Sequence, residues 1–192
     1  AEANGGMQGG NRGRAGARFK AQMQAAARFL KAPAGPRVAV LESGGWDTHA
    51  NQGAAKGILA NRFSMLDEGL AALQHELGGE WSNTVVLTVT EFGRTAAVNG
   101  TRGTDHGTAS AALLTGGAVN GGRVIADWPG LATADLYEGR DLYPTGDIRS
   151  LFKGVLVQHL GLDPVFVDRS VFPDSRSVDM LDDLVGGGTR LA

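Results

Sequence analysis

The sequence contains no cysteine, which excludes disulfide bonds and thiolate metal ligands. No apolar run reaches the roughly 18 residues that a membrane-spanning helix needs. Positive charge is not in excess, since 18 Lys and Arg face 20 Asp and Glu for a net charge of −2, which argues against a nucleic-acid-binding surface. A Walker P-loop, a Gly-x-Gly-x-x-Gly pattern and a Gly-x-Ser-x-Gly elbow are also absent, so nucleotide binding and serine-hydrolase chemistry have no motif here.

What is present is typical of a soluble globular domain. The 192 residues are 42% hydrophobic and 20% charged, and they suffice for one domain with a core. Residues 1–17 are rich in Gly, Asn and Arg and are expected to form a flexible lead-in, and residues 176–192 a carboxyl-terminal tail. The folded part is therefore expected over residues 18–175.

Three segments have the apolar spacing of amphipathic helices. Residues 18–31 place apolar side chains four, three and four residues apart, and residues 59–77 repeat leucine and phenylalanine at the same spacing. Asp147 is a suitable N-cap for a third helix over residues 148–160. Each segment ends close to glycine or proline, as helices commonly do.

Three short apolar runs between these helices have the character of buried strands. They are RVAVLE (37–42), TVVLTVT (84–90) and ASAALLT (109–115). Asn120-Gly121 has the chemistry of a hairpin turn between residues 116–119 and 123–128. The order of helices and strands predicts an α/β fold with a mainly parallel sheet flanked by helices.

Polar side chains follow or precede the predicted strands. Asp47 and His49 come after the first strand, Glu91 directly follows the second, and Asp105 and His106 precede the third. Open α/β sheets bind their ligands at the carboxyl ends of their strands. Two imidazoles with carboxylates suit zinc, manganese or iron, whereas carboxylates alone suit magnesium or calcium. The alternative for the Asp-x-His pattern is a polar loop without a metal.

Arg94 also has two interpretations. It can pair with Glu91 nearby, or it can bind an anionic substrate, because its planar guanidinium matches phosphate, sulfate or carboxylate groups. His75 and His159 lie in predicted helices and are expected to be structural or solvent-facing.

Several stretches, taken in order, resemble one bacterial family over about residues 20–175. The family is numbered 1501 among domains of unknown function, and it resembles a branch of the alkaline phosphatase and sulfatase superfamily. The stretches are GGWDTHANQG, TVVLTVTEFGRT, NGTRGTDHGTA, LLTGGAVNGG, DWPGL, RDLYPTGDIRSL and VFPD.

The superfamily resemblance implies metal ligands at matching positions. Asp47 and His49 resemble a first ligand set, although the superfamily spacing is usually wider. Glu91 falls where an Asp is expected, but Phe92 replaces the His that follows it in the superfamily. His106 resembles a later His ligand.

A second alignment instead matches Asp105-His106-Gly107 to the superfamily Asp-His-Gly. On either alignment the second metal site is incomplete. Family members are generally longer and carry an export signal, often of the twin-arginine type. The resemblance therefore implies that this chain is the carboxyl-terminal half of a larger alkaline phosphatase-like domain. The missing amino-terminal half, as another segment or chain, would be its partner and would supply the nucleophile.

The function implied is that of an exported, metal-dependent hydrolase of phosphate or sulfate esters. The protein would be periplasmic or extracellular, with a small anionic ester as substrate. Asp47, His49 and His106 would hold a divalent metal, with Arg94 stabilising the transition state and Glu91 serving as ligand or general base. Zinc is the first choice, with manganese, magnesium or calcium as alternatives.

The alternative is a non-catalytic exported binding or structural component that retains the fold. A metal that only stabilises the fold lies between these two, because structural sites are closed and catalytic sites keep an open position. The sequence leaves oligomerisation open.

Overall fold

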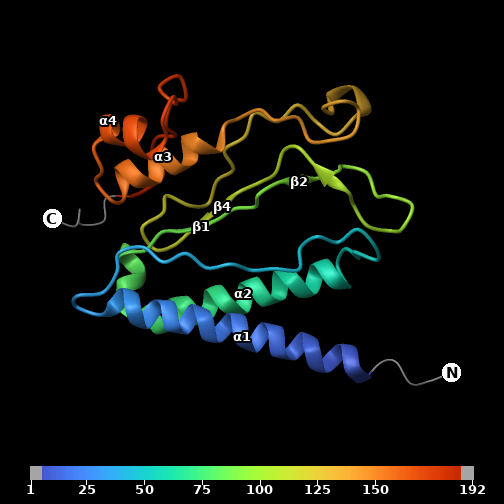
Figure 1. Cartoon of the computed structure of the whole chain (residues 1–192), viewed down its shortest axis with the longest axis horizontal. Coiled ribbons are helices and arrows are strands. Elements are labelled where there is room, and N and C mark those ends of the chain that lie inside the picture. Colours follow the sequence, from blue (N-terminus) through green and yellow to red (C-terminus); the bar gives the residue numbers. More distant parts are fainter. Residues whose placement is uncertain (1–5, 187–192) are drawn as a thin grey trace. The chain divides into compact units, whose positions relative to one another are not determined.

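The computed structural model describes residues 6–186 and divides the chain into two compact units. The first contains residues 1–80 and 98–104, and the second contains residues 81–97 and 105–192. Figure 1 shows the elements coloured in sequence order. They are α1 (Gly6–Lys31), α2 (Ile58–Leu77), η1 (Gly78–Asn83), β1 (Val86–Thr88), β2 (Gly93–Arg94), β3 (His106–Gly107), β4 (Leu113–Thr115), η2 (Thr133–Asp135), α3 (Ile148–Gln158), α4 (Pro164–Phe166) and the π-helical η3 (Val167–Val171).

The first unit is built on two helices, α1 and α2, which pack side by side (Figure 1). Their contact buries the apolar stripe of each helix, which consists of Phe19, Met23, Ala27, Leu66, Ala72, Leu73 and Leu77. Gly69 lies at this contact, because a Cβ there would come within 2.5 Å of the Phe19 ring. The helices predicted over 18–31 and 59–77 are confirmed. The first begins earlier than expected, at Gly6, within the predicted lead-in, whose residues 1–5 lie outside the described part.

The second unit contains the strands and the carboxyl-terminal helices. β1 pairs with β4, with Leu87 opposite Leu114, and β2 pairs with β3. The side chain of Lys153 on α3 is 4% exposed and lies 2.7 Å from an Asp168 carboxylate oxygen, while its Nζ donates to the carbonyls of Ser175 and Val178 at 2.5 and 2.8 Å. Lys153 therefore ties α3 to the segment that follows η3.

The predicted α/β class is wrong. Within residues 6–186 both sheets are two-stranded and antiparallel, and the regular structure is mostly helical, with no parallel sheet. The alkaline phosphatase-like sheet expected from the resemblance is therefore not formed by this part of the chain.

Two of the three predicted strands form in part, since β1 lies within residues 84–90 and β4 within residues 109–115. The strand predicted over residues 37–42 does not form, because an apolar run indicates a need for burial without supplying a partner strand. Residues 37–42 form no strand, and Val38 and Val40 are 57% and 94% exposed. The hairpin predicted at Asn120-Gly121 does not form either: residues 123–128 contain no strand, and Val124 is 90% exposed. Instead, the Asn120 side chain donates to an Asp183 carboxylate oxygen at 2.7 Å.

Among the helices of residues 6–186, none combines the length and the apolar character that a membrane-spanning helix needs.

The start of α3 has a charged cap. The Asp147 side chain accepts from the Arg149 backbone N–H at 2.9 Å, which confirms the predicted N-cap, and it also pairs with the Arg149 guanidinium at 2.5 Å. The hydrogen bond from the Arg149 side chain is the main cause that lowers the pKa of Asp147 to about 2. The same bond raises the pKa of Arg149.

The contact between α1 and α2 predicts opposite effects for two glycine-to-alanine substitutions. Gly69→Ala forces a methyl group against Phe19 and should lower the free energy of unfolding by about 1–3 kcal/mol. Gly16→Ala in α1 meets no atom within 4 Å and should raise it by up to about 1 kcal/mol through helix propensity. Urea denaturation of both variants checks this, and equal effects would contradict the packing described.

The cap of α3 predicts a pH-dependent stability. The folded pKa of Asp147 lies near 2, below the ordinary 3.8, so its contribution is full above the ordinary value and is lost as the pH falls through the folded value. Asp147→Ala should therefore lower stability by about 1 kcal/mol near neutral pH. Asp147→Asn keeps the cap and removes only the charge, so its difference from the wild type should shrink as the pH is lowered toward 2. Thermal melts of the three proteins across this range decide it, and a constant difference would refute the assignment.

Candidate functional site

The segment that carries Asp47 and His49 is anchored to α2 by Trp46. The indole Nε1 donates to the Ser43 hydroxyl at 3.1 Å, and the ring packs edge-on against Phe63 with centroids 5.2 Å apart. Gly45 precedes Trp46 with φ of +88°, a conformation that a residue with a side chain rarely adopts. The chain therefore enters the Asp-x-His stretch with a defined direction.

Residues 48–52 are held against residues 99–104 of the same unit, and we call this contact the loop clamp. At its centre is the Gln52 side-chain oxygen, which accepts hydrogen bonds of 2.7 Å from both the Thr48 and the Thr104 hydroxyls. The Thr104 N–H also donates to the Thr48 carbonyl at 3.2 Å, and both threonines are buried. This network fixes the backbone between Asp47 and His49.

Asn99 forms the second half of the loop clamp. Its amide nitrogen donates to the His49 carbonyl at 3.0 Å, and its oxygen accepts from the N–H groups of Thr101 and Gly103. The Thr101 hydroxyl also donates to the His49 carbonyl, at 2.6 Å. Gly103 is required here because a Cβ would come within 2.3 Å of the His49 carbonyl oxygen.

The loop clamp determines where Asp47 and His49 point. Alternate residues of an extended chain face opposite sides, so the inward Thr48 leaves its two neighbours on the outer side. The His49 Nε2 lies 3.0 Å from an Asp47 carboxylate oxygen, with the side chains 48% and 51% exposed. A carboxylate and an imidazole thus converge at the surface of the first unit.

The second unit brings together a different set of predicted residues. Arg94 on β2 is directly opposite His106 on β3, and the Phe92 ring packs on the His106 imidazole with centroids 4.3 Å apart. The Thr95 N–H donates to the Asp105 carbonyl, and the Asp105 N–H donates to the Thr95 hydroxyl. Asp105 therefore helps to fix the β2–β3 pair through its backbone.

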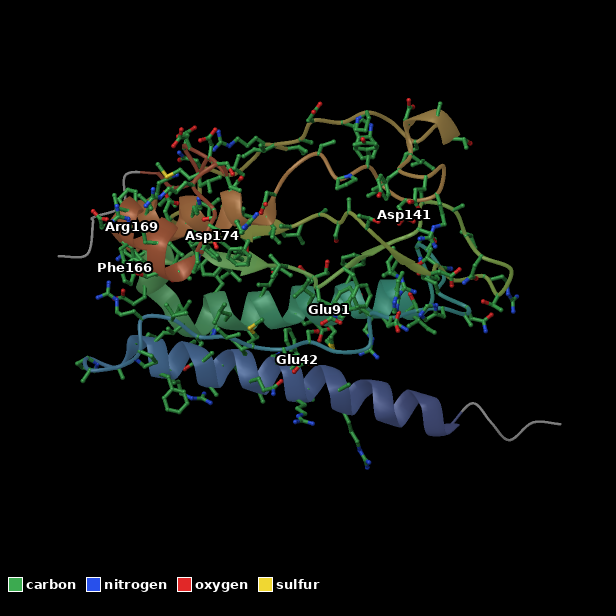
Figure 2. The ribbon with its side chains drawn as sticks, turned by 45° about the horizontal axis from the view of Figure 1, so that its top comes forward. Glu42, Glu91, Asp141, Phe166, Arg169 and Asp174 are labelled. Atoms are coloured by element: carbon green, nitrogen blue, oxygen red, sulfur yellow. The ribbon has the colours of Figure 1, made fainter. Side chains whose placement is uncertain are left out.

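Glu91 lies exposed before β2 (Figure 2). Within residues 6–186 its side chain makes no ion pair with Arg94, so the simple pairing of neighbouring charges is not what places Arg94.

Asp141, also labelled in Figure 2, is a buried carboxylate that the sequence analysis missed. It accepts from the Thr108 hydroxyl at 2.8 Å, its Oδ1 lies 3.1 Å from the Arg140 Nε, and its backbone bridges to Thr95. It thus holds the residues that directly follow β2 and β3, Thr95 and Thr108. The sequence indicates its importance only through its position in RDLYPTGD, which belongs to a stretch that carries the family resemblance.

Comparison with known proteins gives a single kind of result. Residues 1–170 match the family model described as "Protein of unknown function (DUF1501)". No curated protein and no solved structure matches the chain.

The loop clamp predicts that Asn99 controls the rigidity of the segment around His49 through its hydrogen bonds to that segment. Asn99→Ala removes its hydrogen bonds and should speed amide hydrogen exchange in residues 49–52 and 101–103 by about 2- to 10-fold, since each lost hydrogen bond of this kind costs about 0.5–1.5 kcal/mol. Asn61→Ala, at an exposed position of α2, is the control and should leave these amides unchanged. Unchanged exchange in both variants would contradict the clamp.

Proposed function

Since the chain belongs to the DUF1501 family of proteins of unknown function, we propose its activity from its own residues: a metal-dependent hydrolase of phosphate or sulfate esters. Asp47 and His49 serve as two ligands of one divalent metal. The observation that carries the proposal is the convergence of these two side chains on the outer side of a clamped loop.

The geometry of the pair fits a metal with little adjustment. Two ligand atoms on one tetrahedral zinc, each about 2.1 Å from it, lie roughly 3.4 Å apart. The Asp47 oxygen and the His49 Nε2 are 3.0 Å apart, so a change of a few tenths of an ångström suffices, which exposed side chains make readily. A carboxylate together with an imidazole suits zinc best. Manganese, magnesium and calcium are the alternatives, and these metals prefer oxygen ligands to nitrogen.

His106 is the third ligand in this proposal. The support comes from the covalent chain: Thr104 is hydrogen-bonded to Thr48 in the loop clamp, and His106 follows Thr104 by two residues, a span of at most roughly 7 Å. Three protein ligands leave one position of a tetrahedral metal for water or substrate, as in catalytic sites. Asp105 is the neighbouring carboxylate that the second alignment favours.

Arg94 and Glu91 have supporting roles in the proposed reaction. Arg94, opposite His106, presents a planar guanidinium that matches two oxygens of a phosphoryl or sulfuryl group and balances the charge that grows on them. Glu91 is exposed nearby in the sequence and accepts a proton as general base, or adds a further oxygen ligand. When bound, the metal supplies polarisation of the ester oxygen and a lower pKa for its water.

A non-catalytic binding component is the second candidate, and one contact favours it. Phe92 packs its ring on His106, where a second-metal ligand would be expected from the superfamily resemblance. An aromatic ring supplies no ligand atom, so a two-metal site does not form around this residue. A single metal that holds an anion without hydrolysing it agrees with the same contact.

The proposal places the protein outside the cytoplasm, with a further segment or chain as partner. Val40 lies in a segment predicted as a buried strand and Val124 in a segment predicted as a hairpin arm, and both are exposed. Their exposure supports such a partner, since large apolar side chains gain about 1.5–3 kcal/mol each when they are covered. The nucleophile, if the reaction uses one, would come from that partner.

Elemental analysis of the protein after dialysis tests the metal site. The wild type should retain about one divalent metal per chain. His49→Ala and Asp47→Ala should each lower metal affinity at least about 10- to 100-fold, because loss of a residue that only supports a ligand already has an effect of this size. His106→Ala should do the same. His75→Ala, which removes a histidine from α2, is the matched control and should keep the metal.

The same samples separate the two candidate functions. Metal-loaded wild type that hydrolyses p-nitrophenyl phosphate or sulfate, with loss of turnover in Arg94→Ala at retained metal content, supports the hydrolase. Metal retention without turnover of either ester supports the binding component. Equal metal content in His49→Ala and His75→Ala would contradict the site.

A further inference from the structure

The first unit contains a cleft that the proposed metal site does not use. Its volume is about 810 Å³, and it lies between α1, α2 and residues 42–44. Figure 2 labels Glu42 on the extended segment that runs beside the two helices. This volume is within the roughly 300–1,000 Å³ typical of small-molecule sites.

Three arginines line this cleft. Arg14 and Arg18 lie one helical turn apart on α1, and Arg62 comes from α2. Like charges at this helical spacing repel each other, so the cluster is unfavourable unless an anion offsets it. Within the described part of the chain none of the three forms an ion pair with a carboxylate, and Glu42 is the one acidic side chain in the lining.

Arg62 is held in place before any ligand binds. Its guanidinium lies against the backbone of Gly45, where a Cβ would come within 2.3 Å of Nη2. Its Nη1 is 4.0 Å from the Met65 sulfur, and the residue is half-buried. A guanidinium fixed in this way loses less conformational entropy when it binds an oxyanion.

The remaining lining separates into a polar and an apolar part. Gln22, Asn61 and Ser43 offer amide and hydroxyl donors, whereas Phe19, Ile58 and Met65 offer apolar surface. A lone inorganic ion would use only the polar part. The combination matches a molecule that carries an anionic group on an apolar body.

We propose that this cleft binds a small organic oxyanion, a phosphate or sulfate ester or a carboxylate, through Arg14, Arg18 and Arg62. Planar guanidinium groups bind such oxyanions with paired, charge-assisted hydrogen bonds. The apolar body of the ligand lies against Phe19, Ile58 and Met65. This inference does not rest on the metal site, because none of its residues is a proposed metal ligand.

Isothermal titration in low-salt buffer with a chelator tests the proposal without any metal present. The titrants are phenyl phosphate, phenyl sulfate, benzoate and inorganic phosphate. Arg18→Ala and Arg62→Gln should each weaken binding at least about tenfold, the effect of losing roughly one charge-assisted bond. Glu42→Gln should strengthen it, because it removes the one opposing charge. Arg28→Ala is the matched control on α1, since Arg28 pairs with Glu76 outside the cleft.

The titrations distinguish an organic anion from inorganic phosphate, and a specific site from the absence of one. Tighter binding of a phenyl ester or benzoate than of inorganic phosphate supports an organic ligand. Equal affinity for phenyl and inorganic phosphate overturns the role of the apolar lining. Absence of binding to all four titrants, or an equal loss in Arg28→Ala and Arg18→Ala, overturns the site itself. Arg18 is exposed, so its variant is expected to fold, and circular dichroism verifies this. None of these results depends on whether Asp47 and His49 bind a metal.

Discussion

The loop clamp is the interaction on which the candidate site depends. One amide oxygen, that of Gln52, accepts two buried threonine hydroxyls, and Asn99 holds the His49 carbonyl from the other side. Without these bonds the short stretch after Trp46 would be an ordinary surface loop, and its two polar side chains would sample many orientations. With them, backbone alternation alone places a carboxylate and an imidazole 3.0 Å apart. The same unit holds the arginine cleft, and Gly45 connects the two features, since it precedes Trp46 and also makes room for Arg62.

The sequence predicts the helices well because their signal is local. The apolar spacing in 18–31 and 59–77 and the cap at Asp147 each depend on residues within a few turns, and all three helices form. The Asp47–His49 pair was predictable for the same reason, since two residues in an extended stretch share one side. The packing of Phe92 on His106 was not predictable from the sequence. That contact requires the antiparallel register of β2 and β3, which no short sequence pattern encodes. The cleft was missed because Arg62 lies far from Arg14 and Arg18 in the sequence and only the packing of α1 on α2 brings them together.

The failure of the predicted parallel sheet is also informative. Residues 37–42, predicted as a buried strand, and residues 123–128, predicted as one arm of a hairpin, are largely exposed, with Val40 at 94% and Val124 at 90%. A strand needs a neighbour that completes its backbone hydrogen bonds, and pattern recognition assumes that this neighbour exists. The exposed runs therefore fit the proposal of a partner segment or chain. Asp47 and His49, the proposed metal ligands, lie on a part of the molecule that is already ordered by the loop clamp.

We propose that Asp47 and His49 converge to hold a metal. Anomalous diffraction from crystals of the protein soaked in zinc tests it directly, because it locates the ion without reference to activity. A peak is expected about 2.0–2.2 Å from both the Asp47 carboxylate oxygen and a His49 ring nitrogen. A zinc peak bound elsewhere, with Asp47 and His49 still hydrogen-bonded to each other, would contradict it.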